Sequence, residues 1–171
     1  MLKFRQFINE TNLPDDWHQP KTAFHPDFMK KWDDAQITSD RNRGRLMNPV
    51  DGGTVRDAFN KGFVDHLPKP VLSARIRFAT NVNGEHFSGF GHSRDLDGNH
   101  HIVINPNQVD GDKVRGMFHE LQHACDRNAG GRWDSEGGNQ GLSDIDRKAY
   151  LLQPQERRAR RAERTGKIIV R

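Results

Sequence analysis

The chain has 171 residues, of which 27 are Lys or Arg and 23 are Asp or Glu, so its formal net charge is +4. This length, with 33% hydrophobic residues, fits one small domain. No run approaches the ~18 apolar residues of a membrane helix, and residues 1–10 lack the apolar core of a secretory signal, so we expect neither a membrane nor a secreted protein. The one cysteine, Cys125, excludes an internal disulfide framework, whereas nine histidines leave imidazole ligands available for a metal.

The first ten residues carry a short apolar pattern. Phe4, Phe7 and Ile8 are spaced as one face of a helix, with Lys3 and Arg5 beside them. Such a pattern is typical of a short amphipathic helix that docks on a partner.

These ten residues resemble the capsid-targeting peptide of T-even bacteriophage internal proteins, which has two aromatic positions and ends in Leu or Ile, any residue and Glu. Ile8 and Glu10 fit that end, while Leu2 departs from the family's start. The resemblance implies that residues 1–10 bind the prohead scaffold and that the prohead protease cuts between Glu10 and Thr11. The mature domain would then span residues 11–171, inside the capsid first and in the host cytoplasm afterwards.

Residues 11–53 are rich in Asp, Pro, Asn and Arg without a sustained period, so we expect loop-like wrapping with a short helix after Pro26. A longer helix is predicted from Thr54 to about Leu67, because apolar residues recur there at helical spacing and Pro68 follows. The apolar residues of this helix are Val55, Ala58, Phe59, Phe63 and Leu67.

Three strand-like runs follow, at residues 75–79, 86–92 and 100–105. Asn83 and Gly84 form a typical two-residue hairpin turn, and residues 97–99 supply the next turn. The pattern predicts a small antiparallel sheet of about three strands.

Two helices complete the α+β fold that we expect. One runs from a cap at Asp110 or Asp112 to about Arg127, where residues 128–131 break it and a glycine-rich loop begins. The other spans residues 154–164, with Pro154 in its first turn. The sheet should pack on the first of these helices and on the C-terminal helix.

The sequence His119-Glu120-Leu-Gln-His123 is an HExxH motif on the first of these two helices, and its spacing places both imidazoles on one face, one turn apart. With nine His and six Glu in the chain, about 0.02 accidental occurrences are expected. The apolar stripe of this helix lies almost opposite the two histidines, so they should point away from the core. That stripe comprises Val114, Met117, Phe118, Leu121 and Cys125.

The motif and its uncharged neighbours resemble the zincin metallopeptidases. The neighbours that fit are Met117, Leu121, Gln122, Ala124 and Cys125. The resemblance implies a zincin-like fold with one Zn²⁺ per chain, ligated by His119 and His123, and with Glu120 as the general base that polarises a metal-bound water. It also implies that an edge strand, here residues 100–105, pairs with an extended substrate.

A catalytic zinc site has three protein ligands, so one more is required. The longer metzincin pattern is absent, because Asp126 and Ala129 stand where it requires Gly and His. A gluzincin-like arrangement takes a glutamate from a following helix, and Glu156 is preferred because it resembles the Pro-x-Glu-x-x-Ala segments of small HExxH proteins. The other acidic candidates are Asp126, Asp134, Glu136, Asp144 and Asp146.

Several residues could assist such a centre. Tyr150, the single tyrosine, is near Glu156 in sequence and is a candidate oxyanion donor. Gluzincins often carry an acidic residue four positions after the glutamate ligand, but here that position is Arg160, so the group that orients a ligand histidine must come from elsewhere, with Asp144 and Asp146 as candidates. Three histidines could line the cleft; they are His92, His100 and His101.

The two resemblances together imply a zinc-dependent endopeptidase that is packaged in a phage head and acts on a protein or peptide of the host. A packaged DNA-binding protein with a non-catalytic metal site is the alternative, because residues 147–171 hold nine basic and two acidic residues, giving +7 against −3 upstream. Against it, the arginines of the last helix spread around most of its circumference. A cell-wall peptidase with the same fold is a further alternative.

Overall fold

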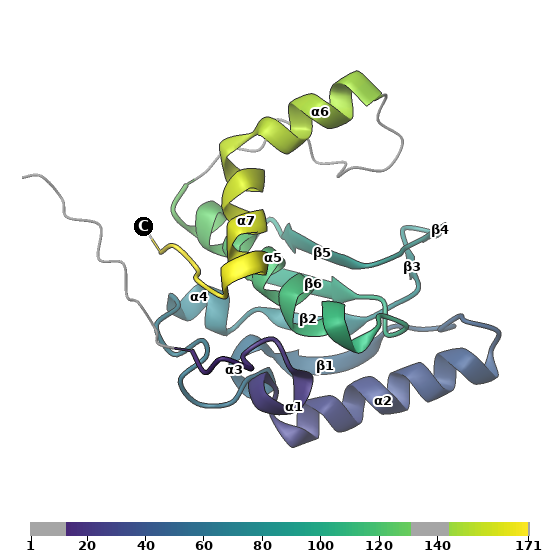
Figure 1. Ribbon diagram of the computed structural model, residues 1–171. Coiled ribbons are helices and arrows are strands. Elements are labelled where there is room, and N and C mark those ends of the chain that lie inside the picture. Colours follow the sequence, from purple (N-terminus) through teal and green to yellow (C-terminus); the bar gives the residue numbers. More distant parts are fainter. Residues whose placement is uncertain (1–12, 131–143, 171) are drawn as a thin grey trace, which may run out of the picture.

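The computed structural model describes residues 13–130 and 144–170, with side chains from residue 147 onward in the second range (Figure 1). The helices are α1 (Pro20–Ala23), α2 (Pro26–Arg41), α3 (Val55–Ala58), α4 (Lys69–Leu72), α5 (Asp110–Asn128), α6 (Asp144–Leu152) and α7 (Pro154–Thr165). The strands are β1 (Val50–Thr54), β2 (Arg75–Phe78), β3 (Asn81–Val82), β4 (Glu85–His86), β5 (Phe90–Arg94) and β6 (His100–Ile104). None of the helices in the described ranges is both long enough and apolar enough to cross a membrane.

The main sheet has four strands in the order β1-β2-β6-β5, and the mixed α+β class is as predicted. The expected three-stranded antiparallel meander is wrong, because β6 inserts between β5 and β2 and runs parallel to β2. Its register pairs Ile76 with Ile102 and Phe78 with Ile104. The predicted edge strand at residues 100–105 is therefore central, and β5 forms the edge instead.

The turns between the strands match the prediction from the sequence. Asn83 and Gly84 both have positive φ, 52° and 82°, and join β3 to β4 in a separate two-stranded hairpin. The second turn is closed by the backbone of Asp95, which bonds to Asn99 at 3.0 Å and leads from β5 into β6. The predicted strand at residues 86–92 is displaced toward the C-terminus, because β5 begins only at Phe90.

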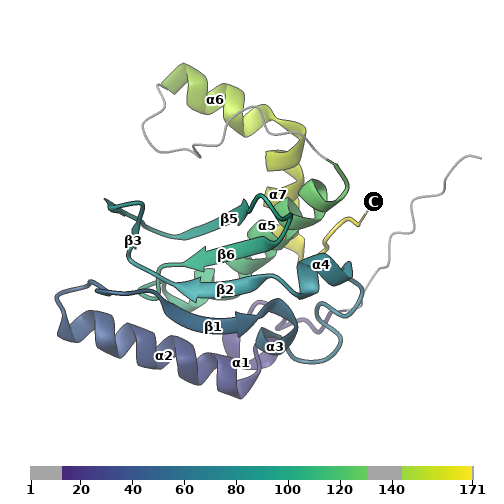
Figure 2. The ribbon, with the colours of Figure 1, turned by 180° about the vertical axis from the view of Figure 1, so that it is seen from behind.

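One face of the sheet carries the core. Ile76 and Phe78 of β2 are fully buried, whereas Arg75 and Arg77 between them are exposed on the other face. Helix α5 covers the apolar face, in front of the sheet in Figure 1 and behind it in Figure 2. Helix α5 is thus part of a helix layer on one face of the sheet, and it lies against β5 and β6 (Figures 1 and 2).

Helix α2 is much longer than the short helix expected after Pro26, and with it the expected loop-like wrapping of residues 11–53 is wrong. Its buried stripe is Phe28, Trp32, Ala35 and Ser39, in which two members are small, so the hydrophobic signal was weak. Trp32 packs its ring 5.3 Å from that of Phe78 and donates its indole N–H to the Pro106 carbonyl at 2.9 Å. Tertiary contacts therefore stabilise this helix.

The predicted helix over residues 54–67 is also wrong, although its apolar residues are all buried. The helical segment ends after α3, because Phe59 is extended and forms a β-bridge with Phe24. The Asn60 amide then donates to the carbonyls of Thr22 and Phe24, at 2.9 and 3.0 Å. These hydrogen bonds to the segment before α2 replace those of a continuing helix.

The edge strand β5 lies close to α5 because the helix carries a glycine at the contact. A Cβ atom built on Gly116 would lie 2.3 Å from the ring of Phe90, well inside van der Waals contact. The Phe90 ring also packs against Trp32, at a centroid distance of 6.1 Å. Gly116 thus sets the distance between β5 and the helix that carries the HExxH motif.

A Gly116→Ala substitution is expected to destabilise the protein by about 1–3 kcal/mol, because the added methyl overpacks this contact. The control is Gly111→Ala on the same helix, where nothing lies within 4 Å of the added atom. That change should stabilise by up to about 1 kcal/mol through helix propensity alone. Chemical denaturation measures both, and equal effects of the two substitutions would contradict the proposed role of Gly116.

Candidate metal centre

Helix α5 presents two buried sides to the protein. The predicted apolar stripe, from Val114 to Cys125, faces the core and is at most 3% exposed. His119 and His123 lie away from that stripe, as predicted, but His123 is nevertheless buried, and Glu156 of α7 lies 3.4 Å from its Nε2. The motif is therefore enclosed by a second helix.

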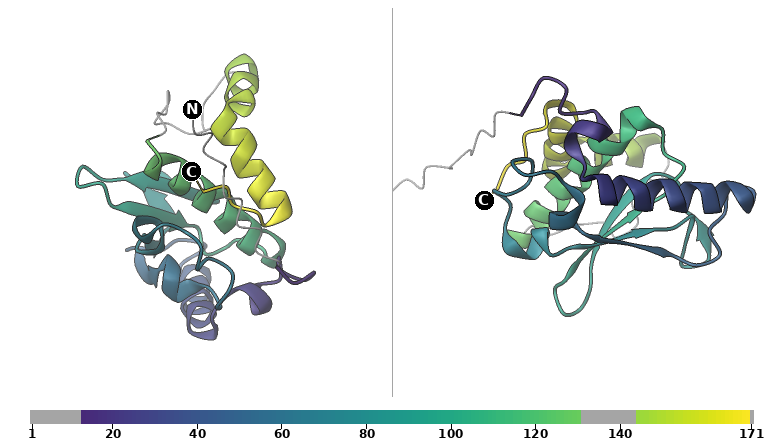
Figure 3. Two further views of the ribbon diagram at one scale, coloured as in Figure 1. Left: turned by 90° about the vertical axis from the view of Figure 1, so that its left-hand side faces the viewer. Right: turned by 90° about the horizontal axis from the view of Figure 1, so that it is seen from below.

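Helix α7 begins at Pro154 and ends in a left-handed Gly166, whose φ is 68°. Ala159 and Ala162 are fully buried, and their small side chains allow α7 to lie alongside α5 (Figures 1 and 3). After α7, the amide of Gln122 binds the backbone of Ile169 at both its N–H and its carbonyl, at 2.7 and 3.0 Å. This pairing fixes the C-terminal segment against α5.

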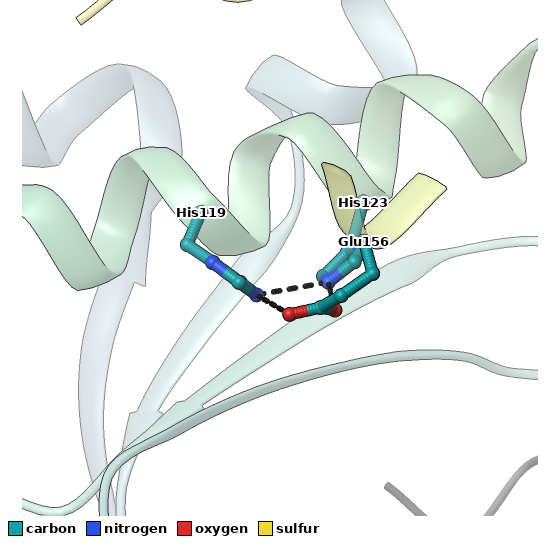
Figure 4. Close-up of side chains that lie close together, drawn as sticks. All are labelled: His119, His123 and Glu156. Atoms are coloured by element: carbon teal, nitrogen blue, oxygen red, sulfur yellow. Dashed lines mark hydrogen bonds and ion pairs between the residues drawn. The ribbon is translucent and has the colours of Figure 1, made fainter. Parts of the chain in front are cut away.

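The first turn of α7 places Glu156 over the two histidines (Figure 4). The Nε2 atoms of His119 and His123 are 3.1 Å apart. The carboxylate oxygens of Glu156 lie 3.7 Å from Nε2 of His119 and 3.4 Å from Nε2 of His123. The structure thus brings together the three residues that the sequence predicted as ligands, in a group that could hold a metal.

The spacing of these atoms matches a tetrahedral zinc site. Ligands at about 2.0–2.1 Å from a tetrahedral ion lie about 3.3 Å from one another. The 3.1 Å between the two imidazole nitrogens lies close to that value. The 3.4 and 3.7 Å distances run to different oxygens of Glu156, and one ligand atom from each of the three residues lies within 4.8 Å of the others. Two imidazoles and a carboxylate are also ligands that zinc prefers, so the residues fit the ion.

Charges around the group favour a cation between the ligands. Burial alone would raise the pKa of Glu156, but the His123 hydrogen bond, His119 and Arg160 lower it to about 2. Burial opposes protonation of His119, yet Glu163, Glu120 and Glu156 outweigh it and raise the pKa of that imidazole. The Glu156 carboxylate is therefore ionised at neutral pH, and the acidic groups around His119 favour positive charge at its ring.

Glu163 is a residue of the centre that the sequence reasoning missed. Its Oε2 lies 3.1 Å from Nδ1 of His119, which leaves Nε2 of that ring toward His123 and Glu156. The residues expected to orient a ligand histidine, Asp144 and Asp146, have side chains outside the described residues. The signal was present, because Glu163 follows Glu156 by two helical turns and so shares its face of α7.

Replacing Glu163 by alanine is expected to lower zinc affinity by about 10–100-fold, because the ligand imidazole loses the group that orients it. Glu163→Gln keeps an acceptor oxygen and should recover part of the loss. The control is Glu85→Ala in the exposed β3–β4 hairpin. Titration against a chelating zinc indicator measures all three, and unchanged affinity in Glu163→Ala would remove this role.

Glu120 lies beside the ligand group on α5 and is 8% exposed. Burial raises the pKa of its carboxyl, and the nearby imidazoles of His123 and His119 reduce that rise. A carboxylate with increased proton affinity next to a candidate metal site is suited to act as a base.

Tyr150 on α6 is half-buried, and burial and the charge of Glu156 raise the pKa of its phenol. The phenol is therefore protonated at neutral pH and can donate a hydrogen bond near the ligands.

The three histidines of the strands lie in two places. His92 and His100 face each other on β5 and β6, with Nε2 and Nδ1 2.8 Å apart. Burial and neighbouring positive charge lower the pKa of His92 to about 3 and that of His100 to about 4, so both are neutral. His101 instead binds Asp95 at 2.9 Å.

Of the other acidic candidates for the third ligand, Asp126 is described together with its partners. Both of its oxygens accept from Nε of Arg158 at 3.0 Å, and it contacts the amide of Gln122 at 3.3 Å. It is therefore occupied by a structural ion pair. The remaining candidates, Asp134, Glu136, Asp144 and Asp146, fall outside the residues whose side chains are described.

Comparisons with known protein families, with curated proteins and with solved structures found no match.

Proposed function

We propose that the protein is a zinc-dependent endopeptidase of zincin type. The observation that carries the proposal is the convergence of His119, His123 and Glu156, whose ligand atoms all lie within 4.8 Å of one another. A buried glutamate, Glu120, adjoins this group on the same helix.

The chemistry assigns one role to each group. A bound zinc ion supplies a Lewis acid that lowers the pKa of water to about 7 and polarises a carbonyl. Glu120 accepts the proton of the attacking water and passes it to the leaving amine. Tyr150, which keeps its proton, is proposed as a donor to the oxyanion.

Strand β5 is the surface that we propose for the substrate, in place of the expected strand at residues 100–105. Within the described residues, β5 pairs with β6 on one side only, so its outer edge offers backbone groups to an extended peptide. Gly116 brings this edge close to the helix that carries Glu120. A peptide added to β5 would therefore run past the metal centre.

The biological setting that we propose, a phage head followed by the host cytoplasm, is supported by the resemblance of residues 1–10 alone; these residues, with the cleavage site at Glu10 and Thr11, lie outside the described ones. Mass spectrometry of the protein from virions should find Thr11 as its N-terminus. An intact Met1 in virions would contradict processing at this site.

The activity is tested by digesting unfolded casein and purified murein with the zinc-loaded protein. Cleavage of casein that a chelator abolishes and added zinc restores is the expected result. Cleavage of murein alone would favour a cell-wall peptidase. Failure to cleave either substrate, or cleavage that the chelator leaves unchanged, would contradict the proposed mechanism.

A further inference from the structure

The five arginines of α7 divide into two sets in the structure. Arg158 binds both oxygens of Asp126 at 3.0 Å, and Arg160 binds Oε1 of Glu156 at 3.1 Å. The other three are exposed, and none forms an ion pair with a described residue. These three are Arg157, Arg161 and Arg164, which we name the basic face.

The basic face is one stripe of the helix. At about 100° per residue, its three arginines fall within about 60° of one another. Ala159 and Ala162, on the opposite side, are fully buried. In the sequence alone, the arginines spread around most of the helix. The two that lie outside the stripe, Arg158 and Arg160, are the two that form ion pairs.

The acidic groups of α7 do not neutralise this stripe. Glu156 and Glu163 both point to the metal centre, where they contact His123 and His119 at 3.4 and 3.1 Å. An open groove of about 500 Å³ is lined by all five arginines of the helix, together with Pro154 and Ile169. Unpaired guanidinium groups this close repel one another, so an anion bound there is stabilised.

We propose that the basic face binds the phosphate backbone of nucleic acid without reading its sequence. Guanidinium groups bind phosphate oxygens in pairs. The three arginines span about 10 Å along α7, a length over which a DNA duplex presents about six phosphates. This function is independent of peptide hydrolysis, and it places bound DNA about 110° around α7 from Glu156.

The test measures binding of a fluorescent mixed-sequence DNA duplex by anisotropy, at 50 and 200 mM salt. Three phosphate contacts predict that the wild-type protein loses about 40-fold in affinity between these concentrations. The triple variant Arg157→Gln, Arg161→Gln and Arg164→Gln should bind at least about 10-fold more weakly at 50 mM, with almost no salt dependence left.

The matched control removes the same charge from an exposed cluster at the end of α2, by Arg41→Gln, Arg43→Gln and Arg45→Gln. It should stay within about threefold of the wild type, because charges beyond the Debye length, about 14 Å at 50 mM salt, are screened. An equal loss in both triple variants, or wild-type binding by the α7 variant, would overturn the proposal. Tighter binding of a poly-glutamate peptide than of the duplex would overturn it as well.

Zinc content, measured on the same samples, separates this proposal from the proposed function. The three arginines contact no ligand, so the α7 variant should retain its zinc. A wild-type protein that binds DNA but holds no zinc would contradict the metal centre alone. A protein that holds zinc but does not bind the duplex would contradict the basic face alone.

Discussion

Glu120→Gln is expected to lower kcat/KM for peptide cleavage by about 10²–10⁴-fold, the usual contribution of a general base. The amide has the shape of the carboxyl group but cannot take the proton of the attacking water. Burial already raises the pKa of Glu120, so a neutral side chain is tolerated at this position and the fold should be unaffected. Rates are measured on the zinc-loaded protein with a quenched fluorescent peptide.

Two further variants sharpen this prediction. Glu120→Asp keeps a carboxylate on a shorter side chain and should retain more activity than Glu120→Gln. Glu85→Gln makes the same chemical change in the exposed β3–β4 hairpin and should cleave as the wild type does. Cleavage by Glu120→Gln at the wild-type rate, with its zinc in place, would remove Glu120 from the mechanism.

Loss of a ligand is expected to affect the metal itself. His123→Ala and Glu156→Gln should each lower zinc affinity by more than about 100-fold, beyond the effect of losing a group that merely orients a ligand. Both residues are buried, at 3% and 2% exposure, so solvent cannot readily replace either ligand. A chelating indicator measures affinity, and elemental analysis measures the zinc that remains.

The free energy of unfolding is a second measurement that tests the same variants. Zinc at 100 times its dissociation constant stabilises the folded wild-type protein by about 2.7 kcal/mol, and this gain should vanish in both ligand variants. His101→Ala is the control, because His101 binds Asp95 rather than the metal group. A wild-type zinc response in Glu156→Gln would exclude Glu156 as a ligand.

The helices that form the centre were readable from the sequence, because local signals and tertiary structure agree there. The apolar stripe of α5 and the i, i+4 histidines follow one helical period. Pro154 and Gly166 mark the two ends of α7, and the structure places its last residue at Thr165, one residue past the predicted end. Glu156 could be proposed as a ligand because its segment resembles the Pro-x-Glu-x-x-Ala segments of small HExxH proteins and lies in the first turn of that helix.

The sheet and the surroundings of the centre depend on long-range contacts, which local patterns do not encode. Strand β6 pairs with β2 in parallel, across the hairpin and β5 that separate them in sequence. Phe59 leaves a helical pattern to pair with Phe24. Glu163 shares the helix face of Glu156 in the sequence, but its contact with His119 also requires α7 to lie beside α5.

The central claim is that one zinc ion is bound by two imidazoles and one carboxylate, and zinc K-edge X-ray absorption of the metal-loaded protein tests it most directly. The account predicts two histidine nitrogens at about 2.0–2.1 Å and carboxylate oxygen at about 2.0–2.2 Å. No sulfur should contribute, because Cys125 is buried and burial raises the pKa of its thiol to about 12. A spectrum with no imidazole shell, or with a sulfur ligand, would contradict the account.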